Sequence, residues 1–183
     1  MPPLVHEFDW PDRVVVGTVG RPGARTFYLQ ARTGARTCSV AMEKQQSAAL
    51  AETIDQLLDQ LMVEPDNTFS IPAAAPAELV DHDPLDQPVE EEFRTGTMRL
   101  SWDPRTLQVV VEAFPVVDGD AQADEDDDEP EPDEVLLVRM PVGTARAFVQ
   151  RTRAVVASGR PACPLCGEPV DEDGHVCAAP QEP

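Results

Sequence analysis

Three of the four cysteines lie near the end of the 183-residue chain, together with a histidine. The ligand-forming residues follow the pattern C-x2-C-x8-H-x-C, and a glycine comes directly after the second cysteine. A Cys-x-x-Cys-Gly turn directs backbone N–H groups at the thiolate sulfurs, and three thiolates with one imidazole complete a tetrahedral shell. The spacing therefore predicts a structural zinc ion held by Cys163, Cys166, His175 and Cys177, with no coordination position left for catalysis.

The alternative for the first two of these cysteines is a C-x-x-C redox pair. Such a pair opens a helix in thioredoxin-like proteins, whereas this one lies between two prolines, Pro161 and Pro169, which favours a loop. The segment is too short to bury a core, so metal binding would supply most of its folding free energy. Cys38 lies in a predicted strand and is expected to be a small buried apolar residue.

Arginines without neighbouring acids form a second candidate for chemistry. Residues 13–42 and 135–162 each contain five arginines and no Asp or Glu. These side chains could be solvated or paired with acids of the same chain, because surface ion pairs are common and weak. They could instead form an anion-binding face that includes Arg139, Arg146 and Arg153, the last two on the exposed side of a predicted helix. A nearby acidic loop would then compete for that face.

Other residues that could do chemistry have plainer explanations. Asp9 and Asp12 are expected to cap turns, and strand alternation places His6 and Asp9 on opposite faces. Asp81, His82, Asp83 and Asp86 could bind a divalent cation weakly, but they lack the frame of a calcium-binding loop. No nucleophile, phosphate-loop or zinc-protease motif occurs. The sequence therefore predicts no catalytic residue.

The spacing of apolar side chains predicts the helices and strands that must position these residues. Residues 44–62 and 145–156 have apolar side chains at helical spacing, whereas the segments before them resemble strands. The first two strands, 4–10 and 12–19, are expected to form a hairpin around Pro11-Asp12. The remaining strands are expected at 26–31, 37–42, 93–102, 106–117 and 135–140. The order of these elements predicts a strand meander followed by a helix in each half of the chain. This indicates an α+β fold with an antiparallel sheet and an internal duplication.

Four segments follow from this division. Residues 1–64 form the first meander and helix, and a connector rich in Pro and acids spans 65–92. Residues 93–160 form the second meander and helix, interrupted at 118–134 by a loop with eleven acids and no base, which is expected to be disordered. Residues 161–183 form the zinc-binding tail.

Composition excludes several classes of protein. The formal net charge of −20 argues against nucleic-acid and membrane-surface binding, since both partners are anionic. No apolar stretch approaches the ~18 residues of a membrane-spanning helix, and the first residues lack the pattern of a secretory signal. Cysteines gathered in one metal-binding tail, rather than spread over loops, favour a reducing cytoplasm.

The chain resembles one known family over nearly its whole length. The motifs that carry the resemblance are Phe8-Asp-Trp-Pro-Asp12, Gly17-Thr-Val-Gly20, Thr26-Phe-Tyr-Leu-Gln-Ala31, the segment 83–93, and the final Cys-Pro-Leu-Cys-Gly with His-Val-Cys. They resemble the uncharacterised actinobacterial family catalogued as domain of unknown function 3090. The resemblance implies a cytoplasmic bacterial protein, and it supplies no reaction and no catalytic residue.

Two classes of function remain open. The missing catalytic motifs and the closed metal shell favour a non-enzymatic binding or adaptor protein that contacts another protein. The alternative is an enzyme that acts on a phosphorylated or other anionic small molecule between the arginine-rich strands and the second helix. The sequence leaves the partner and the oligomeric state open.

Overall fold

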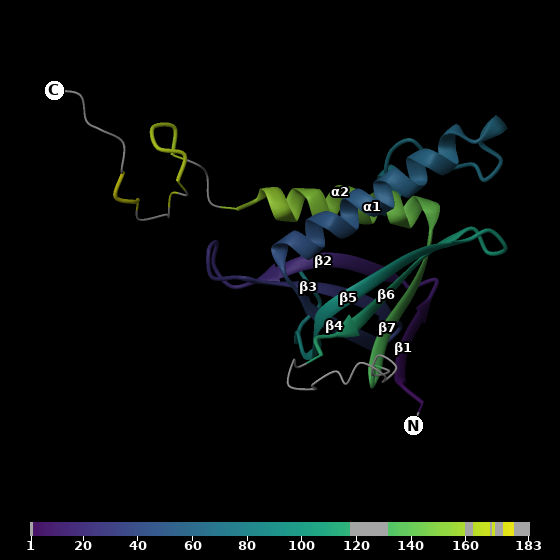
Figure 1. Cartoon of the computed structure of the whole chain (residues 1–183), viewed down its shortest axis with the longest axis horizontal. Helices are drawn as coiled ribbons and strands as arrows, with labels where there is room; N and C mark the ends of the chain where they lie inside the picture. The colour runs from purple at the N-terminus through teal and green to yellow at the C-terminus, as the bar shows by residue number, and fades with distance from the viewer. Residues whose placement is uncertain (1, 118–131, 160–162, 169, 171–173, 178–183) are drawn as a thin grey trace, which may run out of the picture.

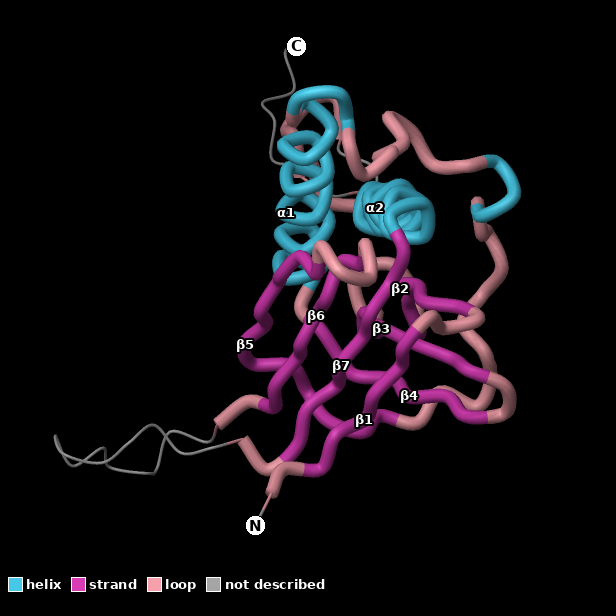
Figure 2. Tube along the Cα trace, turned by 90° about the vertical axis from the view of Figure 1, so that its right-hand side faces the viewer, coloured by secondary structure: helices cyan, strands magenta, loops and turns pink. Residues whose placement is uncertain are grey.

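A seven-stranded sheet carries two helices on the same side in the computed structural model of the chain (Figures 1 and 2). The structure describes residues 2–117, 132–159, 163–168, 170 and 174–177. The strands are β1 (Leu4–Asp9), β2 (Arg13–Val19), β3 (Thr26–Thr33), β4 (Arg36–Met42), β5 (Glu91–Asp103), β6 (Gln108–Pro115) and β7 (Glu134–Pro141). The α-helices are α1 (Lys44–Val63) and α2 (Val142–Ala157), and two short 3-10 helices, η1 (Pro65–Asn67) and η2 (Ala77–Leu79), lie between α1 and β5.

The strand order across the sheet is β1-β7-β6-β5-β4-β3-β2. Neighbouring strands are antiparallel except in two pairs, β1 with β7 and β4 with β5, which are parallel. The expectation of an antiparallel sheet is therefore wrong for these pairs, and the sheet is mixed. The β4–β5 pair is parallel because α1 and the connector behind it return the chain to its starting end before β5 begins.

The predicted hairpin of the first two strands does not form. β1 pairs with β7, in the register Leu4 opposite Glu134, whereas β2 pairs with β3. The link between them, residues 10–12, continues both ladders, because the Trp10 N–H donates to the carbonyl of Arg139 and the Asp12 N–H to that of Arg32. A turn signal such as Pro11-Asp12 marks a change of direction, and it does not by itself choose the strand that will pair.

The two edge strands of the sheet are joined by only these three residues. The sheet therefore curls until its edges approach each other. The Arg36 guanidinium at the start of β4 lies 4.2 Å from the centre of the Phe8 ring of β1, and it also donates to the carbonyl of Glu7. One end of the curled sheet is closed by these contacts.

The core fills the curl and the space beneath the helices. One cluster of buried side chains draws on every strand and on both helices. The helical stripe predicted for α1 is buried as expected, with Leu50, Ile54 and Leu58 at most 5% exposed. α1 begins with a capping box, in which Glu43 and Gln46 each bond the other's backbone N–H.

Each half of the chain contains a run of strands followed by a helix, as expected. The first meander has three strands instead of the four expected, so the two runs are β2-β3-β4-α1 and β5-β6-β7-α2. β1 is additional and forms the edge of the sheet beside β7, to which it is parallel. Of the predicted acidic loop 118–134, residues 118–131 lie outside the described part of the chain, and Glu134 begins β7. Among the described residues, neither helix is long and apolar enough to cross a membrane.

Candidate functional site

A tight turn presents the first two cysteines of the tail. The Gly167 N–H donates to the carbonyl of Cys163 over 2.9 Å, and the Cys163 N–H donates to the carbonyl of Glu168 over 2.8 Å. Gly167 has a φ of +75°, a backbone conformation that costs glycine little. The turn therefore brings the side chains of Cys163 and Cys166 to one side of the loop.

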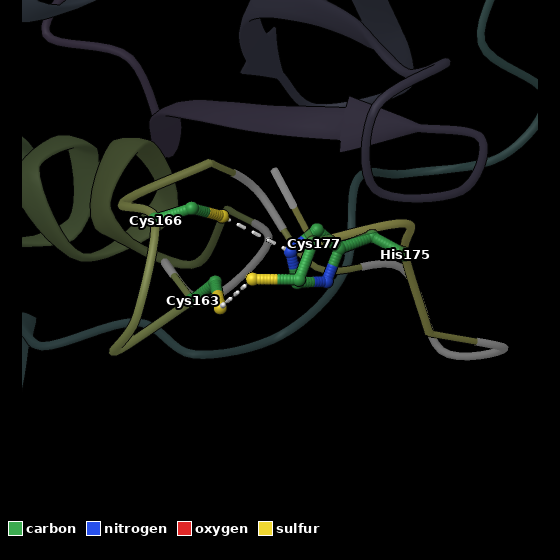
Figure 3. A group of neighbouring side chains, drawn as sticks. All are labelled: Cys163, Cys166, His175 and Cys177. Carbon is green, nitrogen blue, oxygen red and sulfur yellow. Dashed lines mark hydrogen bonds between the residues drawn. The ribbon is translucent and has the colours of Figure 1, made fainter. Parts of the chain in front are cut away.

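The four predicted ligands converge in the structure (Figure 3). The Cys163 and Cys177 sulfurs are 3.9 Å apart, and the Cys166 sulfur is 3.2 Å from His175 Nε2. All four ligand atoms lie within 4.8 Å of one another. A tetrahedral ion with metal–sulfur bonds of about 2.3 Å separates two sulfurs by about 3.8 Å, so the cluster already has the dimensions of a metal shell.

The electrostatics of the turn favour the metal-binding form of Cys163. Backbone N–H groups of Cys166 and then Leu165 face its sulfur and lower the pKa of the thiol from about 9 to about 7. A thiolate, not a thiol, is the metal ligand. The turn thus prepares one ligand for an ion near neutral pH.

Cys38 is separate from this group, as predicted. It is 3% exposed in β4 and belongs to the core. Burial is the main reason that the pKa of its thiol rises to about 12, and the negative charges of Glu92 and Glu134 add to the rise. Cys38 is therefore a neutral thiol at physiological pH.

The three arginines of the expected anion-binding face are paired with acids of the same chain. Arg153 bonds Glu52 and Asp55 of α1, both over 2.9 Å. Arg139 lies 3.6 Å from both Glu7 and Asp103. These two arginines belong to different elements and share no acid, which agrees with the plainer of the two interpretations.

Arg146 is buried rather than exposed, so its predicted position on the outer side of the helix is wrong. Its side chain is 4% exposed and contacts α1 through Asp55 at 2.5 Å and Asp59 at 2.8 Å. It also donates to the carbonyl of Pro72. A helical stripe read from apolar residues alone misses a side chain that is buried by its charge partners.

A different set of arginines does gather, between the first strands and α2. Arg13 of β2 donates to Asp81 over 2.6 Å, and Arg151 of α2 donates to the same carboxylate over 3.0 Å. Arg32 of β3 bonds Asp86 over 3.0 Å, and Arg13 also lies 3.3 Å from it. The arginine–aspartate pocket, which we define by these five residues, includes a cavity of about 400 Å³ lined by Arg13, Arg32, Asp81 and Asp86.

Charges in the arginine–aspartate pocket are tightly coupled. The hydrogen bond from Arg13 is the main cause that lowers the pKa of Asp81, and the same bond raises the pKa of Arg13. Burial lowers the pKa of Arg151. Sequence reasoning identified both arginine-rich segments but not these members, because Arg13 and Arg151 are brought together only by the packing of α2 on β2.

The remaining candidates also have defined roles. Asp9 accepts a hydrogen bond from Gln108 over 2.8 Å, and Asp12 accepts one from the Gly34 N–H over 2.7 Å, so each bonds a residue far along the chain instead of capping its own turn. Asp81 accepts hydrogen bonds from the guanidinium groups of Arg13 and Arg151. His6 meets Glu134 instead of Asp9, with His6 Nε2 and Glu134 Oε1 2.5 Å apart.

Comparison with known protein families gives a match over most of the chain. A family model described as a protein of unknown function, DUF3090, matches residues 6–177. Neither a curated protein nor a solved structure matches the chain. The matched range includes the sheet, both helices and all four ligands of the tail.

Proposed function

The chain belongs to the DUF3090 family, and we propose that it is a non-enzymatic binding or adaptor protein whose tail folds around a structural zinc ion. Three thiolates and one imidazole are the ligand set that zinc prefers in closed structural sites. Cys163, Cys166, His175 and Cys177 would all be ligands, which leaves no position for a substrate. Reduced thiols of this kind fit a cytoplasmic location.

The observation that carries the proposal is the exposure of apolar side chains beside the ligands. Leu165 and Val176 are 76% and 97% exposed, and each is adjacent to a ligating cysteine. A metal ion that fixes the two ligand segments would hold these side chains in place, so the tail would need no hydrophobic core of its own. A rigid exposed pair of aliphatic residues is suited to insertion into another protein.

The chemistry of the partner follows from the tail's charge. Residues 163–183 contain five acids and no Lys or Arg. A partner surface with a small apolar hollow and basic residues at its rim would match both features. Nucleic acid fits poorly, because an acidic tail repels phosphate.

The experiment is affinity capture from the native host with quantitative mass spectrometry. The intact chain is compared with a Leu165→Asp/Val176→Asp variant and with Val63→Asp, a control at an exposed apolar residue at the end of α1. Proteins retained by the intact chain and by the control, but lost from the tail variant, support the adaptor. Equal capture by all three contradicts it.

A second candidate function is an activity on an anionic small molecule at the arginine–aspartate pocket. The observation that favours it is the cavity of about 400 Å³ between β2, β3 and the segment 81–87. The ligand would have to displace Asp81 or Asp86 from their arginines, so we rank it below the adaptor. A metabolite thermal-shift screen tests it: a phosphorylated compound that stabilises the intact chain but not Arg32→Gln supports an anion site.

A further inference from the structure

Three side chains from distant parts of the sequence meet at one end of the sheet, and none of them belongs to the tail. They are His6 of β1, Glu92 of β5 and Glu134 of β7. Their ligand-forming atoms all lie within 4.8 Å of one another. We refer to them as the sheet-end cluster.

The topology explains why they meet. β1 is parallel to β7 and β4 is parallel to β5, while β5 and β7 are each antiparallel to β6. The strands β1, β4, β5 and β7 therefore all run in the same direction and begin at the same end of the sheet. His6, Glu92 and Glu134 each lie within the first three residues of their strands.

Strand alternation directs two of these side chains inward. Phe8 and Leu136 are at most 1% exposed in the core, and residues two apart in a strand share a face. His6 and Glu134 therefore project to the core side at its rim, where their side chains are 19% and 23% exposed. Glu92 is more exposed and lies toward solvent.

The cluster has an excess of negative charge. It has two carboxylates and one imidazole, and Glu134 pairs with the imidazole of His6. The described part of the chain shows no Arg or Lys paired with Glu92 or Glu134. The positively charged Arg36 lies nearby, but its guanidinium contacts the Phe8 ring and the Glu7 carbonyl and forms no ion pair with either carboxylate among the described residues. Like charges held close together, and partly removed from water, are costly without a compensating cation.

A second, independent feature lies next to the cluster. Cys38 is 3% exposed and carries a free thiol. It occupies the core side of β4, the strand beside β5, two residues after Arg36 at the same end of the sheet. Its thiol packs as a small apolar group, and the negative charges of Glu92 and Glu134 act on it, so Cys38 forms part of the buried wall beside the cluster.

We propose that the sheet-end cluster is a second metal site, in which His6, Glu92 and Glu134 bind a divalent transition-metal ion. One nitrogen and two carboxylate oxygens suit ions such as Mn²⁺, Fe²⁺ or Zn²⁺. Three protein ligands leave coordination positions open on the solvent side of Glu92. This site is therefore of the open type, in contrast to the closed shell of the tail.

The test is a titration of the full chain with Mn²⁺, after one equivalent of zinc has filled the thiolate site of the tail and excess zinc has been removed. Mn²⁺ prefers oxygen and nitrogen ligands to thiolates and is detected directly by electron paramagnetic resonance. We expect one bound Mn²⁺ whose pulsed spectrum shows coupling to an imidazole nitrogen. Weak binding to acidic loops would give no such coupling.

Three variants make the result specific. His6→Gln should abolish the nitrogen coupling, and Glu92→Gln should weaken Mn²⁺ binding about tenfold or more. Glu90→Gln is the matched control, since it removes a nearby carboxylate outside the cluster. Glu92 is exposed at the start of its strand, so its variant should fold even if His6→Gln does not. The absence of nitrogen coupling in the intact chain, or equal weakening by Glu92→Gln and Glu90→Gln, would overturn the proposal.

Discussion

Asp81 connects two arginines that come from opposite ends of the sequence. It accepts hydrogen bonds from Arg13 of β2 and from Arg151 of α2. The Asp83 N–H also donates to it, over 2.9 Å. A carboxylate with this many donors is held in its charged form, which is why its pKa lies below the ordinary value.

Stability should depend on pH through this residue. The pKa of Asp81 is lower in the folded than in the unfolded chain, so its contribution is fully present above about pH 4 to 5 and is lost as pH falls through the lowered folded pKa. Asp81→Asn should therefore cost roughly 1–3 kcal/mol at pH 7 and much less near pH 2. Urea unfolding of the intact chain, Asp81→Asn and the control Asp83→Asn at both pH values measures this. A loss of stability that is independent of pH would contradict it.

Gly17 is a position where only hydrogen fits. A Cβ there would lie 2.5 Å from Leu85 Cγ and 2.6 Å from its Cδ2, and Leu85 is 4% exposed. Gly17→Ala should therefore destabilise the protein by about 1–3 kcal/mol. Leu85→Ala removes the obstacle, so the double variant should lose less stability than the sum of the two single variants.

The control for this pair is Gly96→Ala. Its Cβ would meet backbone atoms, including the Pro115 carbonyl oxygen at 2.9 Å, and no side-chain truncation can relieve that contact. In the double variant with Leu85→Ala, the losses of stability caused by Gly96→Ala and by Leu85→Ala should simply add. Thermal unfolding of the six proteins (the intact chain, the three single and the two double variants) decides the matter, and additivity at Gly17 would show that Leu85 is not the obstacle.

Residues close in sequence were predictable as a site, and residues far apart were not. Cys163, Cys166, His175 and Cys177 lie within one short segment, so their spacing alone constrains their geometry. The contacts of Arg13 with Asp81 and of His6 with Glu134 span 68 and 128 residues. Such contacts depend on strand order and helix packing, which no local pattern encodes.

The two helices are fastened to each other by arginines of α2 and acids of α1. Arg146 is buried between Asp55 and Asp59, whereas Arg153 is half exposed, its side chain 49% accessible, and bonds Glu52 and Asp55. The ion pairs of Arg146 and those of Arg153 should therefore contribute different amounts to the free energy of unfolding. Removal of one partner of a buried pair leaves an uncompensated charge, but an exposed pair contributes little.

Arg146→Ala should lower the free energy of unfolding by about 3–5 kcal/mol, and Arg153→Ala by about 0–1 kcal/mol. Arg146→Met, which keeps the length of the side chain but not its charge, should also be destabilising because Asp55 and the Pro72 carbonyl lose their donor. Denaturant unfolding compares the three variants. Equal losses for Arg146→Ala and Arg153→Ala would mean that burial does not distinguish these pairs.

At the scale of whole elements, the sequence located the segments more successfully than it paired them. The helix predicted at 44–62 spans Lys44–Val63, because its apolar period is long and regular. The first strand was expected to pair with the second, yet it pairs with β7. Local composition determines whether a segment is extended, whereas pairing depends on the whole sheet. The internal duplication stays a prediction, which the repeated order of strands and helix agrees with.

The tail and the body of the molecule should respond differently to loss of metal. The body has its own core, whereas the tail has Cys163 as its one buried residue among those described. Cys166→Ser should release about one zinc ion per chain and increase hydrogen exchange over residues 163–177, while the melting of the sheet and helices is unchanged. Elemental analysis and exchange mass spectrometry test this, with Cys38→Ala as a control that should retain the zinc. Unfolding of the whole chain by Cys166→Ser would show that the tail is part of the main cooperative unit.

The pairing of β1 with β7 has a consequence during synthesis on the ribosome. His6 leaves the ribosome long before Glu134, its neighbour 128 residues later. At about 5–20 residues per second this interval is on the order of 10 s, whereas the next strand along the chain would follow within roughly one to two seconds. The first strand to be made is thus among the last to find its place. Until then the Phe8 side chain, bound for the core, is open to capture by chaperones that bind nascent chains.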